Sequence, residues 1–241
     1  MDINCDMGEV SESWYSGYDK QILKYITSIN ISCGAHAGTE TLILDTVREA
    51  LKLKLRIGAH PSFPDSKNFG RKVIEMPLPM LKQSILEQVM LLKVIVEKEG
   101  GKLHHIKPHG ALYNLATYDT DVASMLIGVV KEIDETLILY CPSGSMMEEE
   151  SSKMGIKVWR EAFVDRNYAE NGSLVNRSNK NALITNPQLA LNQVKNIVNF
   201  KLVKSLEGQI LPMEADTFCV HGDGPTSVEI AETLSNYFSD R

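Results

Sequence analysis

The spacing of hydrophobic residues changes repeatedly along the chain. Short apolar runs alternate with stripes, in which apolar residues recur every three or four positions. The runs predict seven strands, which we expect at residues 2–9, 27–33, 55–61, 104–107, 137–141, 156–163 and 217–220. The stripes predict helices, which we expect at about residues 39–51, 77–99, 119–133, 143–154, 187–198 and 226–238. About 20 residues after Arg166 lack a helical period, which is typical of lids and binding loops.

Strand and helix alternate throughout, and this order predicts a parallel sheet with helical crossovers. Seven such units predict an α/β fold, a TIM-like barrel that is closed or nearly closed, with an open doubly wound sheet as the alternative. No linker, low-complexity tract or change of composition divides residues 1–241, so we expect one domain.

Charge and composition narrow the possible partners. The chain has 241 residues and a formal net charge of −6, which argues against nucleic acid or an anionic membrane as a partner. No run of about 18 apolar residues predicts a membrane span, and the first residues lack the pattern of an export signal. We therefore expect a cytoplasmic protein.

The four cysteines are widely separated and lie in or beside apolar runs. This placement predicts free, buried thiols in a reducing compartment. A catalytic role for Cys5 or Cys33 is the alternative, because both lie beside other polar candidates.

The segment from His104 to Asn114 combines a buried strand with chemically active side chains. Lys107 and His109 are two residues apart, so an extended chain places them on one face. Pro108 cannot donate to a strand ladder, which places it at the strand's end or just beyond. Gly110 allows a sharp turn or the close approach of a ligand. A cation and a base therefore gather where this strand ends.

Other strands end in the same way, and ligands of both barrel and doubly wound folds bind beyond the carboxyl ends of the strands. The residues expected there are Asn4, Asp6, Glu9, His36, His60, Lys107, His109, Glu161, Asp165, Arg166, His221 and Asp223. His104 and His105 lie within one strand, so we expect their side chains to face opposite ways in structural roles. For Arg71 and Arg166, a salt bridge within a loop is the alternative to a ligand contact.

Two kinds of hydrolytic chemistry fit these residues. Asp6, His36 and His60 could hold a divalent metal that activates water. Alternatively, Asp6 or a histidine acts as a general base without metal, and Lys107 stabilises an oxyanion. The sequence contains no GxxxxGK[ST] loop, so a nucleotide would have to bind in another way.

Several blocks of residues also resemble a known family. They are NCDMGE at 4–9, CGAHAG at 33–38, GAHP at 58–61, FGR at 69–71, KPHGALYN at 107–114, DRNY at 165–168 and VHGDGP at 220–225. Together they resemble the LamB/YcsF family, the A subunits of bacterial ATP-dependent 5-oxoprolinase. The resemblance implies a seven-stranded, TIM-like barrel of the glycoside hydrolase/deacetylase type. It also implies cleavage of 5-oxo-L-proline to L-glutamate with ATP hydrolysis, and partner subunits B and C.

These observations lead to one hypothesis for the site and two rival functions. We expect the catalytic core to be Asp6, His36, His60, Lys107 and His109. We expect the substrate contacts to be Asn4, Glu9, Arg71, Asn114, Arg166, His221 and Asp223. One rival is a stand-alone, metal-dependent carbohydrate amidase or deacetylase with its metal on Asp6, His36 and His60. The other is a non-catalytic subunit that delivers substrate to its partners.

Overall fold

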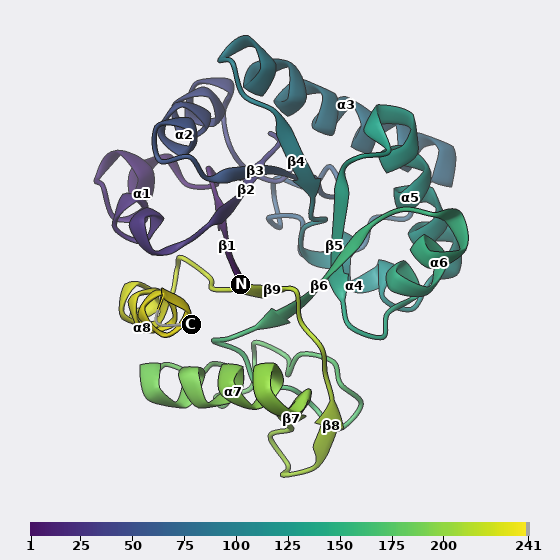
Figure 1. The fold of residues 1–241 in the computed structure, drawn as a ribbon. Helices are drawn as coiled ribbons and strands as arrows, with labels where there is room; N and C mark the ends of the chain where they lie inside the picture. Colours follow the sequence, from purple (N-terminus) through teal and green to yellow (C-terminus); the bar gives the residue numbers. More distant parts are fainter. Residues whose placement is uncertain (240–241) are drawn as a thin grey trace.

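A closed barrel of parallel strands lies at the centre of the computed structural model, which describes residues 1–239 (Figure 1). The barrel strands, in spatial order, are β1 (Asp2–Met7), β2 (Ser28–Ser32), β3 (Arg56–His60), β4 (Leu103–Ile106), β5 (Ile138–Pro142), β6 (Val158–Phe163) and β9 (Thr217–Cys219). The last strand closes the barrel by pairing with both β1 and β6. The predicted seven-stranded TIM-like barrel is therefore confirmed, and the open sheet is excluded.

Helices surround the barrel. They are α1 (Ser11–Tyr15), α2 (Glu40–Lys52), α3 (Leu78–Lys98), α4 (Gly110–Ala116), α5 (Thr120–Asp134), α6 (Met146–Met154), α7 (Pro187–Phe200) and α8 (Ser227–Ser239). Two 3₁₀ turns, Asp19–Gln21 and Leu23–Tyr25, follow α1. Thr39 caps α2 by accepting a hydrogen bond from the Leu42 amide, and Asn186 caps α7, which begins with Pro187. These caps satisfy amide groups that have no partner within the helix.

The elements that were not predicted include a hairpin and a short helix at the site. A two-stranded antiparallel hairpin, β7 (Leu202–Lys204) and β8 (Ile210–Pro212), lies beside the end of α7 (Figure 1). The short helix α4 begins directly after His109. Residues 166–186 contain no helix, as predicted, and are held by two isolated antiparallel bridges within the segment, Arg166 with Leu183 and Tyr168 with Leu174.

The inner face of the barrel is polar, whereas the outer face is apolar. Along β1, Asp2 and Asn4 point inward, and Ile3 and Cys5 alternate with them. Near the amino ends of the strands, the Asp2 carboxylate accepts hydrogen bonds from Thr217, Ser28 and Tyr140. Buried polar groups are costly unless they are paired, so this network allows polar side chains to fill the barrel.

A bulge in β4 changes where its histidines point. Ile57 of β3 pairs with Leu103 and Gly58 pairs with His105, so His104 is an extra residue. A bulge of this kind puts two residues opposite one. The two imidazoles consequently touch, with Nδ1 atoms 3.1 Å apart. The prediction that His104 and His105 face opposite ways is therefore wrong.

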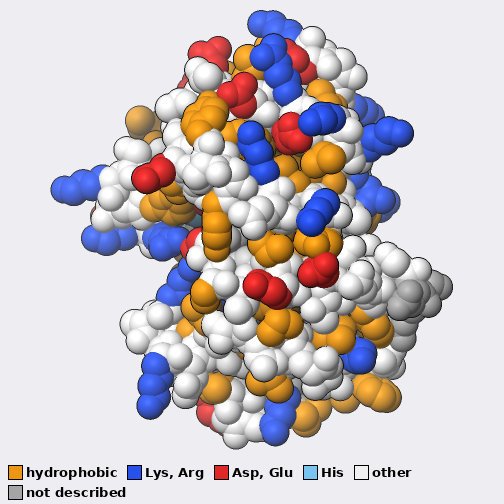
Figure 2. Space-filling view, turned by 90° about the vertical axis from the view of Figure 1, so that its left-hand side faces the viewer, with side chains coloured by type: hydrophobic (Ala, Val, Ile, Leu, Met, Phe, Trp, Pro, Cys, Tyr) orange, Lys and Arg blue, Asp and Glu red, His pale blue; other side chains and the backbone are white. Residues whose placement is uncertain are grey.

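The surface mixes charge and apolar groups. On the face in Figure 2, charged side chains of both signs are interspersed with hydrophobic ones. Among residues 1–239, no helix has both the length and the apolar character needed to cross a membrane. All four cysteines are buried and free, as predicted.

Candidate functional site

A cavity of about 760 Å³ opens at the carboxyl ends of the barrel strands, within the range of roughly 300–1,000 Å³ that is usual for ligand pockets. The predicted site residues that line it are Asp6, Glu9, His60, Arg71, Lys107, His109, Asn114, Arg166, His221 and Asp223. The two exceptions are His36, which lies behind Glu9, and Asn4, which lies below Lys107. The strand-end residues thus converge on one mouth of the barrel.

Lys107 is enclosed between two carboxylates. Its Nζ lies 2.9 Å from Asp6 Oδ1 and 2.9 Å from Glu161 Oε1. It also lies 3.2 Å from Asn4 Oδ1 and 3.2 Å from Cys219 Sγ. The Lys107 side chain is 3% exposed, so its charge is used within the protein and not offered to a ligand.

The ion pair fixes the protonation states of this group. Burial alone would raise the pKa of Asp6, but its interactions with His60 and with the Lys107 ammonium hold that pKa well below its usual value. Burial alone would lower the pKa of Lys107, and the surrounding negative charge raises it instead. Asp6 is therefore a carboxylate and Lys107 an ammonium at neutral pH.

His36 and His109 stack face to face, with ring centroids 3.9 Å apart. Burial lowers the pKa of each ring to about 3, so both are neutral at pH 7. His36 uses both of its nitrogens within the protein, because Nδ1 lies 3.0 Å from Ser62 Oγ and Nε2 lies 3.1 Å from Glu9 Oε1. Its position supports Glu9 and the neighbouring ring.

His60 and His109 each direct one ring nitrogen toward the other. His60 Nδ1 lies 2.7 Å from the Lys107 carbonyl oxygen, and His109 Nε2 lies 2.9 Å from the Phe69 carbonyl oxygen. A carbonyl oxygen only accepts, so each of these two nitrogens carries a proton. The remaining nitrogens, His60 Nε2 and His109 Nδ1, are 2.9 Å apart.

Two carboxylates approach the two rings. Asp6 Oδ2 is 3.4 Å from His60 Nε2, and Glu9 Oε1 is 3.6 Å from His109 Nδ1. Among these residues, Glu9 and His109, together with His36, have ligand atoms that all lie within 4.8 Å of one another. Nitrogen and oxygen ligands of this kind fit a divalent metal. The set differs from the predicted one, because Glu9 and His109 take the place of Asp6 and His60.

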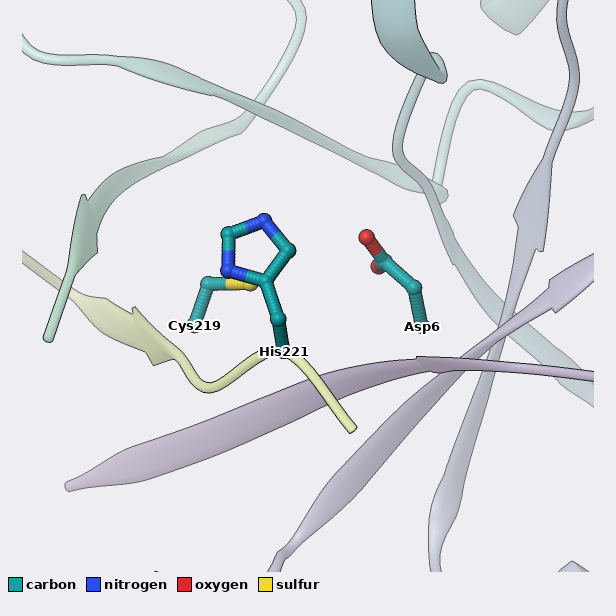
Figure 3. A group of neighbouring side chains, drawn as sticks. All are labelled: Asp6, Cys219 and His221. Carbon is teal, nitrogen blue, oxygen red and sulfur yellow. The ribbon is translucent and has the colours of Figure 1, made fainter. Parts of the chain in front are cut away.

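A second group of possible ligands lies across the mouth. Cys219 and His221 project from the end of β9 toward Asp6 of β1 (Figure 3). Burial raises the pKa of the Cys219 thiol well above its usual value, and a metal binds the thiolate. His221 Nδ1 donates to Asp165 Oδ1 at 2.9 Å, which leaves Nε2 as the nitrogen able to bind a metal. A metal here would also have to displace the proton of the buried Cys219 thiol.

Two glycines allow the site loops to meet. Gly110 begins α4 at φ +55°, and a Cβ there would lie 2.7 Å from the Gly70 carbonyl oxygen. Gly70 has φ +63°, and a Cβ there would lie 2.9 Å from His109 Cδ2. Only glycine adopts such backbone angles without strain and leaves this space free. The loop that contains Gly70 thus makes the close approach that Gly110 allows.

Several residues of the site had no predicted role. Glu161 was recognised at a strand end but not assigned, although it is the second partner of Lys107 and accepts a hydrogen bond from Tyr113 at 2.7 Å. Asn30 donates to Asp6 at 2.7 Å from inside the barrel. A charged or amide residue within an otherwise apolar strand is the signal that points to both, because such a residue needs a buried partner.

The fold and the mouth define the class. A closed parallel α/β barrel with ionisable side chains at the carboxyl ends of its strands has the arrangement of TIM-barrel-like enzymes. The sequence model described as the LamB/YcsF family matches residues 1–241, and the chain belongs to this family.

Relatives and a solved structure are similar over almost the whole chain. The A subunit of 5-oxoprolinase from Heliobacterium modesticaldum is 38% identical over 97% of this chain and 92% of that protein. The A subunit of 5-oxoprolinase from Bacillus cereus strain Q1 is 38% identical over 100% of this chain and 95% of that protein. The crystal structure of a lactam utilization protein from Thermus thermophilus superposes with a TM-score of 0.91 and 35% identity, covering 100% of this chain and 96% of that one.

Proposed function

We propose that residues 1–241 form the single catalytic domain of the A subunit of a cytoplasmic, ATP-dependent 5-oxoprolinase, which cleaves 5-oxo-L-proline to L-glutamate together with subunits B and C. The observation that carries this proposal is the convergence of Asp6, Lys107, Glu161, His60 and His109 at one mouth of the barrel. Membership of the LamB/YcsF family and the names of the relatives support the substrate. The lactam utilization protein with the same fold supports the reaction class.

The chemistry begins from a poor electrophile, because the lactam carbonyl is stabilised by resonance. Transfer of the γ-phosphoryl group of ATP to the lactam oxygen would make the ring carbon reactive and release ADP. Water then attacks that carbon and the carbon–nitrogen bond breaks, with the nitrogen leaving as the amine. A second water hydrolyses the resulting acyl phosphate to L-glutamate and phosphate, so one lactam and one ATP consume two waters.

The residues of the mouth have roles that follow from their contacts. His60 Nε2, unprotonated when the ring is neutral, accepts the proton of the attacking water, and Asp6 at 3.4 Å stabilises the imidazolium. Lys107 helps to keep Asp6 ionised and fixes the positions of Asp6 and Glu161. His36, His109 and Glu9 form the wall behind this pair.

The group formed by Glu9, His36 and His109 favours a second candidate, a metal-dependent amidase. These three residues would hold the divalent cation, which lowers the pKa of bound water when present. The third candidate, a subunit that only binds substrate, would leave the acid and base residues of the mouth without a role in ring opening.

One assay separates the three candidates: glutamate release from 5-oxo-L-proline, with and without ATP, with and without the partner subunits, before and after EDTA. We expect release only with ATP and partners. Asp6→Asn and Lys107→Met should each reduce it by about a hundredfold or more, because each disrupts the support of the His60 general base, and the exposed Asp121→Asn should not. ATP-independent activity that EDTA abolishes would favour the amidase. Full activity in both site variants would favour the binding subunit and overturn the proposal.

A further inference from the structure

The cavity contains a buried cation that has no counterion among residues 1–239. Arg166 follows β6 and is 5% exposed. One guanidinium nitrogen donates to the Val175 carbonyl oxygen at 2.7 Å. Its Nε is buried and has no hydrogen-bond partner within the same residues. A buried, partly unsatisfied guanidinium costs free energy that a bound anion would recover.

The carboxylate next to Arg166 in sequence does not neutralise it. Asp165 accepts hydrogen bonds from the His221 amide and from His221 Nδ1, at 3.0 and 2.9 Å. None of the ion pairs within the described part of the chain includes Arg166. Its positive charge is therefore available inside the cavity.

A second guanidinium increases the positive charge at this wall. Arg177 lines the same cavity, and its ion-pair partner is Asp223, whose oxygen lies 3.5 Å away and whose side chain is 64% exposed. Burial and the charge of Arg177 lower the pKa of Arg166, so the two cations repel each other across a short distance. Two guanidinium groups in a partly buried wall match the geometry of a carboxylate or a phosphoryl group.

Lys107 cannot serve the same purpose. Its ammonium is already paired with Asp6 and Glu161, and these three groups together carry a net negative charge. An anionic ligand would be repelled from this group and attracted to the wall formed by residues 166 and 173–177. The two ends of the cavity thus differ in charge, which would orient a ligand that is neutral at one end and anionic at the other.

We propose that Arg166 and Arg177 form an oxyanion subsite that binds the carboxylate or phosphoryl end of the ligand, with the reacting group directed toward Asp6 and His60. The subsite has two possible sources of anion if the proposed function holds: the carboxylate of 5-oxo-L-proline and the phosphates of ATP. Both are recognised by the same bidentate chemistry.

Calorimetric titration of the full chain tests this assignment with three probes: 5-oxo-L-proline, its neutral carboxamide, and inorganic pyrophosphate. The variants are Arg166→Gln, Arg166→Lys and Arg177→Gln. The Arg177 side chain is 38% exposed, so its variant keeps the test valid where loss of Arg166 unfolds the chain. Arg48→Gln is the matched control, because Arg48 pairs with Glu99 on the surface.

We expect Arg166→Gln and Arg177→Gln to weaken binding of one anionic probe by about tenfold or more, the loss typical of a charged hydrogen bond. Arg166→Lys should keep only part of the affinity that Arg166→Gln loses, because lysine lacks the planar guanidinium group. Loss confined to 5-oxo-L-proline, with no change for its carboxamide, assigns the subsite to the substrate carboxylate. Loss confined to pyrophosphate assigns it to the nucleotide.

The inference is overturned if both glutamine variants bind both anions within about twofold of wild type, as Arg48→Gln should. This outcome would leave the proposed function intact, because the catalytic assay does not depend on it. Conversely, a wild-type complex without 5-oxoprolinase activity would refute the proposed function, whereas the pyrophosphate titration would still decide whether the two arginines bind an anion.

Discussion

His105 Nε2 lies 2.6 Å from Asn30 Oδ1 in the middle of the barrel, and this contact determines which way the Asn30 amide faces. An amide oxygen only accepts, so His105 donates through Nε2. The Asn30 nitrogen then points toward Asn4 Oδ1 and Asp6 Oδ1, at 2.8 and 2.7 Å. A histidine outside the cavity thereby positions a carboxylate inside it.

Replacing His105 with phenylalanine should therefore affect both stability and activity. Phe keeps the stacking on Tyr140, whose ring centroid is 4.0 Å away, but leaves the Asn30 oxygen buried without this donor. We expect a loss of about 1–3 kcal/mol in the free energy of unfolding and a lower kcat for ring opening. Urea denaturation and the glutamate assay measure the two effects.

His105→Gln provides the comparison, because its amide retains a donor and should restore part of kcat. If His105→Phe loses stability but keeps the wild-type kcat, the contact is structural and does not position Asp6.

Lys107→Met tests the ion pair directly. The substitution leaves Asp6 and Glu161 buried together without their cation. Removing one partner from a buried ion pair typically costs about 3–5 kcal/mol of unfolding free energy. The double variant Lys107→Met with Glu161→Gln should recover part of this loss, because one uncompensated charge is gone.

Lys153→Met is the surface control, since Lys153 pairs with Glu149 at a side-chain exposure of 57%, and we expect a change below about 1 kcal/mol. If Lys107→Met alone and Lys107→Met with Glu161→Gln lose the same unfolding free energy, the charge of Glu161 is not what makes the loss of Lys107 costly.

Gly58→Ala tests how closely β3 and β4 pack inside the barrel. A Cβ at residue 58 would lie 2.0 Å from His105 Nε2, so the imidazole would have to move. We expect a loss of at least about 1–3 kcal/mol in unfolding free energy, measured by thermal or urea denaturation. His105→Ala in the same chain should relieve the overlap.

Gly128→Ala is the opposite case. Nothing lies within 4 Å of a Cβ there, and the residue is inside α5, so alanine should stabilise the protein by about 0.5–1 kcal/mol. A Gly58→Ala variant as stable as Gly128→Ala would contradict the close packing at His105.

Acidification should destabilise the protein through its neutral histidines. His36 and His109 have pKa values of about 3 in the folded chain, against about 6.5 when unfolded. Between these values the unfolded chain binds more protons, so stability falls as pH decreases, by up to about 1.4 kcal/mol per pH unit for each ring. Burial raises the pKa of Glu9, so in the pH range where Glu9 titrates this carboxyl group makes the folded protein more stable as pH decreases.

Urea denaturation at about pH 7, 6 and 5, a range that spans the unfolded pKa, measures this dependence. His36→Gln removes one of the two rings, so its unfolding free energy should fall less steeply with decreasing pH than that of the wild type. Parallel curves for the two proteins would show that folding does not lower the pKa of His36.

Much of the fold follows from short-range patterns in the sequence. The alternation of Ile3 and Cys5 with polar neighbours and the cap at Thr39 each reflect local geometry, which is why these elements were predicted. The hairpin of β7 and β8 was missed because each strand has three residues and most of them are exposed. The bulge at His104 depends on how β4 pairs with β3, and no local pattern encodes it.

The site was predicted in outline because strand ends share one rim of the barrel. This rule predicted that Asp6, His60 and Lys107 lie at the same rim, although it gave no distance between them. It could not show that Lys107 pairs with Glu161, because that contact joins strands far apart in the sequence. Nor could it show that His36 is neutral, because the low pKa arises from burial that only the assembled loops create.

Closure of the barrel by β9 bears on how the protein is made. The first strand obtains one of its two neighbours from residues 217–219, near the end of the chain. During synthesis, Asp2 and Asn4 must wait for Thr217 before their hydrogen bonds can form. Contacts so distant in sequence slow folding, and an unpaired strand edge promotes aggregation. The growing polypeptide therefore stays vulnerable until residues 217–219 can pair with β1, and the mouth is completed only when this strand closes the barrel.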